Sequence, residues 1–196
     1  LAEGEADATS ALEHPGLFPG LPPYGSLALV DVMLAKGKLA EATDLFAQAV
    51  SRHAAAGHIR YLQMRARLRA AEGHADGALE DLFACGRLEQ EWDARTPAFS
   101  TWRADAVPLL VSVDRMDEAR TLAQEEHERC RAFRAPAPLA ASLRSLALVE
   151  QGASQVALLE QAVAEVQRSP ARLERAITLL ELGAATRRAG RRADAA

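Results

Sequence analysis

The side chains that could do chemistry in this sequence are scattered, and they match no known metal-binding or nucleophile pattern. Five histidines occur, but no two lie four residues apart and none follows a glutamate by three residues. Those are the spacings that zinc-protease helices and di-iron helices need. Cys85 and Cys130 are single and far apart, so they fit neither a disulfide framework nor a zinc site. We expect both to be small buried side chains.

Two other groups have the outline of a functional motif but lack essential parts. Residues 20–26 have the glycine spacing of a phosphate-binding loop, yet Ser26 stands where the lysine belongs and two prolines remove backbone amides. The acidic stretch 125–129 has the pattern of a solvated helix face with local ion pairs. The sequence therefore predicts no catalytic, metal or cofactor site, and we expect that the chain is not an enzyme.

The composition argues against several classes of partner. The 196 residues carry a formal net charge of -4 and a pI of about 5.8, so the chain lacks the positive field that nucleic-acid binding requires. No apolar run approaches the roughly 20 residues of a membrane span, and no signal peptide is recognisable. We therefore expect a cytoplasmic protein that binds neither nucleic acid nor membranes.

The elements that must position these side chains are helices. Hydrophobic residues make up 49% of the chain but aromatic residues only 5%, so alanine and leucine dominate and no sheet is expected. Residues 1–23 are expected to form a linker or cap that is partly irregular. Beyond them, amphipathic segments are interrupted at intervals of 36, 41, 38 and 38 residues, at Gly37, Gly73, Asp114, Gly152 and Gly190. An alanine follows each interruption by five residues, where two helices must approach closely: Ala42, Ala78, Ala119, Ala157 and Ala195.

This period is typical of helical-hairpin repeats. Residues 24–196 are therefore predicted to form an all-α fold, a right-handed superhelix of about five tetratricopeptide-like hairpins. The hairpins are expected at about 24–57, 58–94, 99–135, 138–169 and 171 onward. The unit around Gly152 is out of step, which predicts a register shift or a longer turn. Pro108 lies inside the helix expected over 99–113 and predicts a kink or a later helix start.

Candidate binding residues come from the first helix of each hairpin, which lines the concave face of a tetratricopeptide stack. Counting back from the turns places five polar or aromatic residues there: Tyr24, Asp31, Arg60, Gln63 and Arg67. Because a guanidinium can hold a carboxylate with two hydrogen bonds, Arg67 and then Arg60 are the preferred contacts for a protein or small-molecule effector. Arg65 and Arg69 share another helix face. The alternative is that Arg60 and Arg67 are ordinary solvated charges.

Two further groups have both a structural and a functional interpretation. The aromatic residues at the joint around Pro97 either fill the gap between two hairpins or bind a ligand; the group consists of Trp92, Phe99, Trp102 and Arg103. The basic cluster near the end of the chain either completes a helix terminus or docks a partner, and it consists of Arg187, Arg188, Arg191 and Arg192.

Two stretches share their motifs with a known family. The first comprises Arg67–Gly73, Ala78–Leu82, Gly86, Arg87, Trp92, Pro97–Phe99, Trp102 and Arg103; the second comprises Ser169–Ala176 and Leu182–Asp194. Together they resemble the helical-repeat region of the large ATP-binding LuxR-type transcriptional regulators, the group similar to the maltotriose-responsive activator. The resemblance covers roughly residues 60–196.

The resemblance implies a sensor and interaction arm between an N-terminal ATPase module and a C-terminal DNA-binding module, neither of which is present in this sequence. ATP would bind in the missing N-terminal module, so no cofactor is expected in this segment. Such an arm would bind an effector or a protein and take part in self-association, which implies a homo-oligomer. A free-standing tetratricopeptide adaptor that binds a peptide in its concave groove is the alternative. The chain begins without methionine and ends within a helical pattern, as a segment of a longer protein would.

Overall fold

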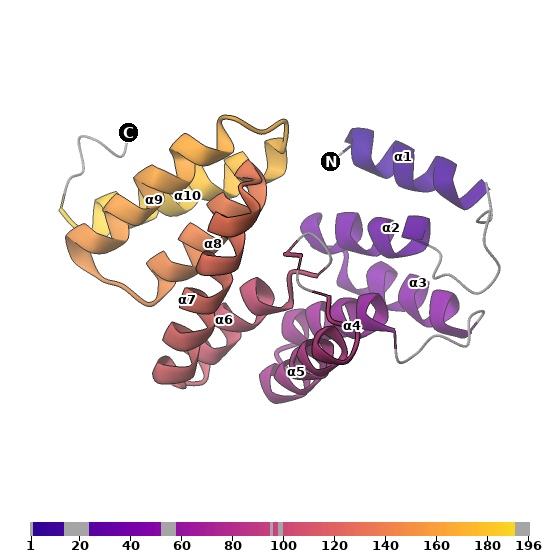
Figure 1. The fold of residues 1–196 in the computed structure, drawn as a ribbon. Coiled ribbons are helices and arrows are strands. Elements are labelled where there is room, and N and C mark those ends of the chain that lie inside the picture. Colours follow the sequence, from indigo (N-terminus) through magenta and orange to yellow (C-terminus); the bar gives the residue numbers. More distant parts are fainter. Residues whose placement is uncertain (1, 14–23, 52–57, 95, 98–99, 191–196) are drawn as a thin grey trace. The chain divides into compact units, whose positions relative to one another are not determined.

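The computed structural model describes residues 2–13, 24–51, 58–94, 96–97 and 100–190, and every regular element in these ranges is an α-helix (Figure 1). The chain divides into two compact units, Leu1–Trp92 and Asp93–Ala196. The first unit contains α1 (Ala2–Glu13), α2 (Tyr24–Ala35), α3 (Leu39–Ser51), α4 (Ile59–Ala71) and α5 (Ala75–Glu91). The second contains α6 (Trp102–Ser112), α7 (Met116–Phe133), α8 (Pro136–Leu148), α9 (Gly152–Val166) and α10 (Arg172–Arg188). No helix in the described ranges is long and apolar enough to cross a membrane.

The helices pair as hairpins near the predicted boundaries, α2 with α3, α4 with α5, α6 with α7, and α8 with α9. Each of the five predicted interruptions has a left-handed backbone, with φ of 73° at Gly37, 83° at Gly73, 61° at Asp114, 60° at Gly152 and 86° at Gly190. Glycine and aspartate tolerate this conformation, which closes the end of the preceding helix at every one of these positions except Gly152, the first residue of α9. After α4, for example, the amide of Gly73 donates to the Ala70 carbonyl and that of His74 donates to the Arg69 carbonyl.

The core of the first unit joins three helices. Leu27 and Val30 of α2 pack with Ala42 and Ala49 of α3 and with α4, which contributes Tyr61, Met64 and Leu68. The ring of Tyr61 lies 6.1 Å from that of Phe46, and its hydroxyl donates to the Ala49 carbonyl at 3.5 Å. Small side chains at positions 42 and 49 let α3 lie close to its neighbours, and the sequence predicted this close approach at Ala42.

The predicted alanine register holds in three hairpins and shifts in the fourth. Ala42, Ala78 and Ala119 are fully buried, whereas Ala157 is exposed. Helix α9 begins at Gly152 itself, whereas α3, α5 and α7 each begin two residues after the turn residue. Relative to its turn residue, α9 therefore starts two residues earlier than the equivalent helices. Gln155 thus occupies the position that the buried alanine has in the other hairpins. Its side-chain amide donates to the Ala147 carbonyl at 2.8 Å.

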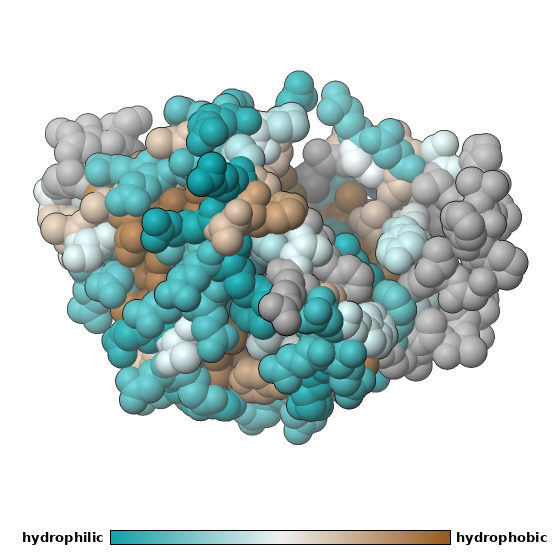
Figure 2. Space-filling view, in the orientation of Figure 1, coloured by the Kyte–Doolittle hydropathy of each residue, from teal (hydrophilic) through white to brown (hydrophobic). Residues whose placement is uncertain are grey.

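Part of the core of the second unit lies between α8, α9 and α10. Ala140 and Leu143 pack with Ala162 and Val166, and further along the helices Val156 packs with other buried residues that include Ala185. The view in Figure 2 shows apolar residues between mostly hydrophilic ones over this unit. On α10 three leucines are exposed: Leu173, Leu179 and Leu180.

The structure gives more detail on two other segments. Residues 2–13 of the expected cap form helix α1, which packs on α2 and places Glu5 in an ion pair with Lys36. Helix α6 begins at Trp102, three residues later than drawn from the sequence, and keeps Pro108 in its interior. The proline-rich stretch 14–23, Phe99 and the residues after Gly190 lie outside the described residues.

Candidate functional site

A cavity of about 250 Å³ lies between α2 and α4 in the first unit. It contains all five residues that the sequence analysis placed on the concave face and three apolar ones, and its lining is Tyr24, Leu27, Ala28, Asp31, Arg60, Gln63, Met64 and Arg67. Within each helix these residues are three or four positions apart, so they lie on one side of it. The cavity therefore has polar and charged groups around an apolar floor made by Leu27, Ala28 and Met64.

The three floor residues were not predicted as site residues. The signal was available, because Leu27 and Ala28 lie three and four positions after Tyr24, and Met64 lies four after Arg60. Leu27 and Met64 also belong to the hydrophobic core, so apolar character alone does not distinguish a cavity wall from the interior.

The two arginines of the cavity differ in their contacts with carboxylates. Arg67 Nη1 donates to Asp31 Oδ1 at 2.7 Å, which joins α4 to α2 across the cavity. The two side chains remain 32% and 44% exposed, respectively, so water reaches the pair. No described residue forms a hydrogen bond or an ion pair with the Arg60 guanidinium. Arg60 is therefore the cation at this site that an incoming anion can approach directly.

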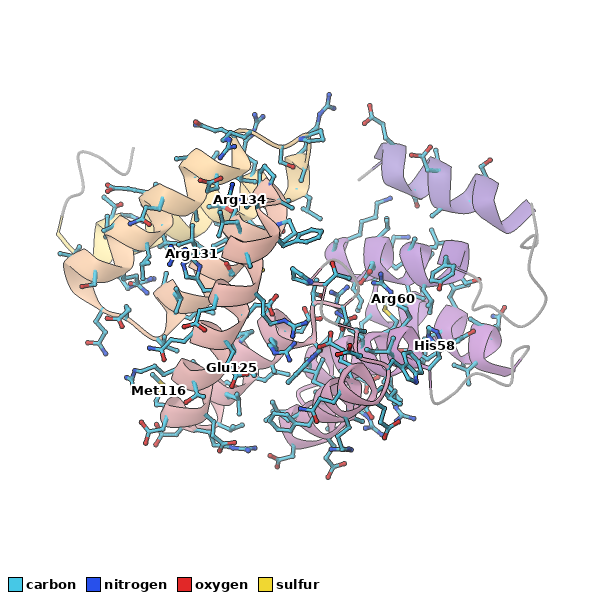
Figure 3. All side chains as sticks on the ribbon, in the orientation of Figure 1. His58, Arg60, Met116, Glu125, Arg131 and Arg134 are labelled. Carbon is cyan, nitrogen blue, oxygen red and sulfur yellow. The ribbon has the colours of Figure 1, made fainter. Side chains whose placement is uncertain are left out.

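The start of α4, which carries Arg60, is fixed by His58 (Figure 3). His58 Nδ1 accepts a hydrogen bond from the backbone amide of Arg60 at 3.3 Å, as a helix N-cap does. The His58 ring lies against Trp92, with ring centroids 5.8 Å apart. Burial lowers the pKa of His58, and the positive charge of Arg60 lowers it further. The neutral imidazole can accept the amide hydrogen bond, whereas the protonated ring cannot.

The opposite side of α4 is held by a buried carboxylate of α5. Asp81, whose side chain is 5% exposed, accepts hydrogen bonds from Arg65 at 2.6 and 2.9 Å and from Arg69 at 2.9 Å. Arg69 also donates to the Gly77 carbonyl. The hydrogen bonds that Arg65 donates to Asp81 raise the pKa of Arg65. The prediction that Arg65 and Arg69 share a face away from Arg67 is confirmed, and their role here is to join two helices.

The aromatic residues expected at the joint have different environments. Trp102 is buried, and the Arg103 guanidinium carbon lies 4.4 Å from the centre of its ring. Arg103 is buried as well, and its Nε lies 3.8 Å from Glu125 Oε2. Trp92 is 48% exposed and contacts His58. Trp102 and Arg103 are therefore packed within the second unit.

The acidic stretch on α7 is less solvated than the sequence predicts. Glu126 is buried, because it lies on the same side of α7 as Ala119, Ala123 and Cys130, which are also buried. The prediction of a solvated face is therefore wrong at this position. The Cys130 thiol donates to Glu126 Oε1 at 3.5 Å, and the His127 ring Nδ1 lies 3.2 Å from the Ser142 hydroxyl of α8.

This cluster does not have the properties of a reactive site. Burial raises the pKa of the Cys130 thiol to about 12, and the charge of Glu126 adds to the effect, so the nucleophilic thiolate is scarce at neutral pH. Both cysteines are buried, as predicted, and neither is in a disulfide. Within the described ranges, no group of three or more histidine, cysteine, aspartate or glutamate residues could hold a metal ion.

Three apolar residues of the fourth hairpin are expected, from their spacing to Gly152, to be core or an apolar floor: Leu139, Leu146 and Val149. Val149 is buried and Leu139 packs against the core, as this spacing predicts. Since the packing register of α9 is displaced by two residues, Arg144 is the residue that corresponds to Asp31 and Arg67. Its guanidinium donates to Glu181 and Glu174 of α10.

The comparisons with known proteins identify the fold. The sequence matches no model of a protein family and no curated protein. The structure is similar to the crystal structure of BtubC (BKLC) from P. vanneervenii, with a TM-score of 0.66 and 17% sequence identity over 99% of this chain and 83% of that one. It is also similar to the nearly identical TPR-like repeats of a putative kinesin light chain from Podosopora anserina, with a TM-score of 0.59 and 21% identity over 88% of this chain and 89% of that one.

At these identities the likeness concerns the fold alone. The chain has a tetratricopeptide-like helical-repeat fold, and the predicted all-α class is confirmed. Repeats of this kind stack on their neighbours and form extended concave surfaces. The hypothesis that the chain comes from a LuxR-type regulator is more specific than the fold, and it stays a prediction.

Proposed function

We propose that this chain is a protein-interaction module and that the cavity between α2 and α4 binds an acidic segment of a partner polypeptide. The observation that carries the proposal is the Arg60 guanidinium, which lines a cavity with an apolar floor and has no ionic partner among the described residues. A carboxylate that approaches Arg60 forms charge-assisted hydrogen bonds, which are stronger than neutral ones. The floor of Leu27, Ala28 and Met64 accepts an adjacent apolar side chain.

The test uses a defined pair of peptides. One is the acetylated and amidated hexapeptide Glu-Glu-Leu-Leu-Glu-Glu, labelled with a fluorophore, and the other replaces each glutamate with glutamine. Fluorescence anisotropy is expected to show tighter binding of the acidic peptide to the 196-residue chain, with an affinity that falls as salt is added.

Arg60→Ala is expected to weaken binding of the acidic peptide by about tenfold, the size of one charge-assisted hydrogen bond. Arg168→Ala is the matched control, because its side chain is 68% exposed and lies in the other unit. Equal binding of the two peptides, or equal effects of the two substitutions, would contradict the proposal. If glutarate displaces the labelled peptide at a concentration similar to that of the unlabelled peptide, the ligand is instead a small-molecule carboxylate.

A second proposal concerns the protein in which this module acts. Because residues 67–103 and 169–194 carry motifs similar to those of LuxR-type regulators, we propose a sensor and interaction arm of an ATP-dependent transcriptional activator. ATP would then bind outside this segment, and the arm would take part in self-association. The coding sequence on both sides tests this directly. A phosphate-loop motif upstream and a helix-turn-helix downstream are expected, whereas their absence would favour a free-standing adaptor.

A further inference from the structure

We infer that Asp31 is an internal competitor for the acidic segment: its carboxylate occupies Arg67 inside the cavity that Arg60 lines, and its removal strengthens binding. The inference rests on the proposed function. In this inference Asp31 weakens the binding of an acidic segment, whereas Arg60 strengthens it. Asp31 therefore sets the affinity of the site and the number of carboxylates that it favours in a ligand.

The first step is geometric. Asp31 and Arg67 come from different helices, and both line the same cavity as Arg60. The contact between Arg67 Nη1 and Asp31 Oδ1 is 2.7 Å long, the length of a charge-assisted hydrogen bond. A ligand carboxylate would form the same type of bond with this guanidinium, so Asp31 stands where part of a ligand could stand.

The second step separates this ion pair from those that hold the helices together. Asp81 between Arg65 and Arg69 is almost fully buried, and Arg144, which holds two glutamates, is 18% exposed. The side chain of Asp31 is 44% exposed, so solvent screens its attraction to Arg67. Exposed pairs contribute little to folding. The pair of Asp31 with Arg67 therefore adds little to the stability of the fold.

The third step is the balance of charge in the cavity. With Asp31 ionised, the lining carries two arginines and one aspartate, a net charge of about +1 from these three groups. Without Asp31 the two guanidiniums remain, and the cavity attracts anions more strongly. The present arrangement therefore favours ligands with one carboxylate near Arg60, while a second carboxylate must displace Asp31 from Arg67.

The experiment measures binding of the Glu-Glu-Leu-Leu-Glu-Glu peptide to variants of the whole 196-residue chain. Asp31→Ala removes the competing oxygen atoms and is expected to tighten binding by about tenfold, while Asp31→Asn has a smaller effect in the same direction. Asp44→Asn is the charge-matched control, because Asp44 is exposed on α3 and does not line the cavity. Adding Arg67→Ala to Asp31→Ala is expected to remove the gain.

The outcomes distinguish this inference from the proposed function. If Arg60→Ala weakens binding but Asp31→Ala leaves it unchanged or weakens it, the competitor role is wrong and the acidic-segment site stands. If the wild-type chain and all variants fail to bind the peptide, the proposed function is wrong. An equal gain in Asp44→Asn would show that net charge alone is responsible and would also overturn the inference. Thermal unfolding of each variant confirms that the fold is intact.

Discussion

The Arg144 guanidinium on α8 binds the Glu181 carboxylate on α10 through two hydrogen bonds of 3.1 Å, from Nε to Oε2 and from Nη2 to Oε1. The same guanidinium also contacts Glu174, so one side chain of α8 holds two positions of α10. Arg144→Ala is expected to lower the free energy of unfolding by about 2 kcal/mol, because it leaves two carboxylates without their donor. Urea unfolding measures this loss. Arg168→Ala, which removes an exposed pair with Glu165, is expected to have almost no effect.

The left-handed turns provide a paired test of backbone strain. Gly73→Ala is expected to destabilise the protein by about 1 kcal/mol, because φ at Gly73 is 83° and a Cβ there is strained although nothing lies within 4 Å of it. Asp114→Gly is expected to change stability by less than about 0.5 kcal/mol, since relief of strain is offset by the greater freedom of glycine in the unfolded chain. Thermal melts of the two variants check the contrast. Equal destabilisation would show that the turns do not share one conformational requirement.

The shifted register of the fourth hairpin predicts opposite outcomes for one substitution at two equivalent sequence positions. Ala119→Leu adds volume where the side chain is fully buried and is expected to destabilise the fold by about 2 kcal/mol. Ala157→Leu places the same side chain at an exposed position of α9 and is expected to be tolerated. The midpoint of chemical denaturation distinguishes them. A comparable loss in Ala157→Leu would place that residue against another helix.

The half-buried His127 predicts a pH dependence of stability. Burial lowers its pKa from the ordinary value of 6.5, Arg131 lowers it further, and Glu128 opposes them. Below about pH 6.5 the unfolded chain therefore binds more protons at this residue than the folded protein, so stability falls as the pH decreases from 6.5 through the lowered folded pKa. Above 6.5 the residue is neutral in both states and has no such effect.

His127→Gln is expected to flatten this part of the stability curve, measured by urea unfolding at several pH values between about 5 and 7.5. His58 has a lowered pKa as well, so the comparison is made against the wild-type slope and against His58→Gln. An unchanged slope in His127→Gln would mean that protonation of His127 is equally easy in the folded and unfolded chain.

The hairpin organisation could be predicted because its signals are local. A left-handed residue ends a helix by itself, so Gly37, Gly73 and Asp114 indicate turns without knowledge of what packs nearby. The register of α9 depends instead on contacts across the hairpin, and the left-handed residue Gly152 gave the wrong reference point.

The cavity could be predicted in part for the same reason. Helical spacing brings Arg60, Gln63 and Arg67 to one side of α4, and that spacing is written in the sequence. The hydrogen bond between Asp31 and Arg67 joins residues 36 positions apart and depends on how α2 lies against α4. The burial of Glu126 also depends on neighbouring helices. A charged residue in an acidic stretch gives no local sign of it.

The hydrogen bonds that join Asp81 to Arg65 and Arg69 have a consequence for the kinetics and entropy of the proposed binding. They fasten α4 to α5, so the helix that carries Arg60, Met64 and Arg67 is held in place whether or not an acidic segment is bound. The backbone of α4 is thus ordered during folding, and an acidic segment that binds to it loses mainly its own conformational freedom. Preorganised surfaces of this kind associate without a preceding rearrangement, so differences in affinity among ligands should appear chiefly in their dissociation rates.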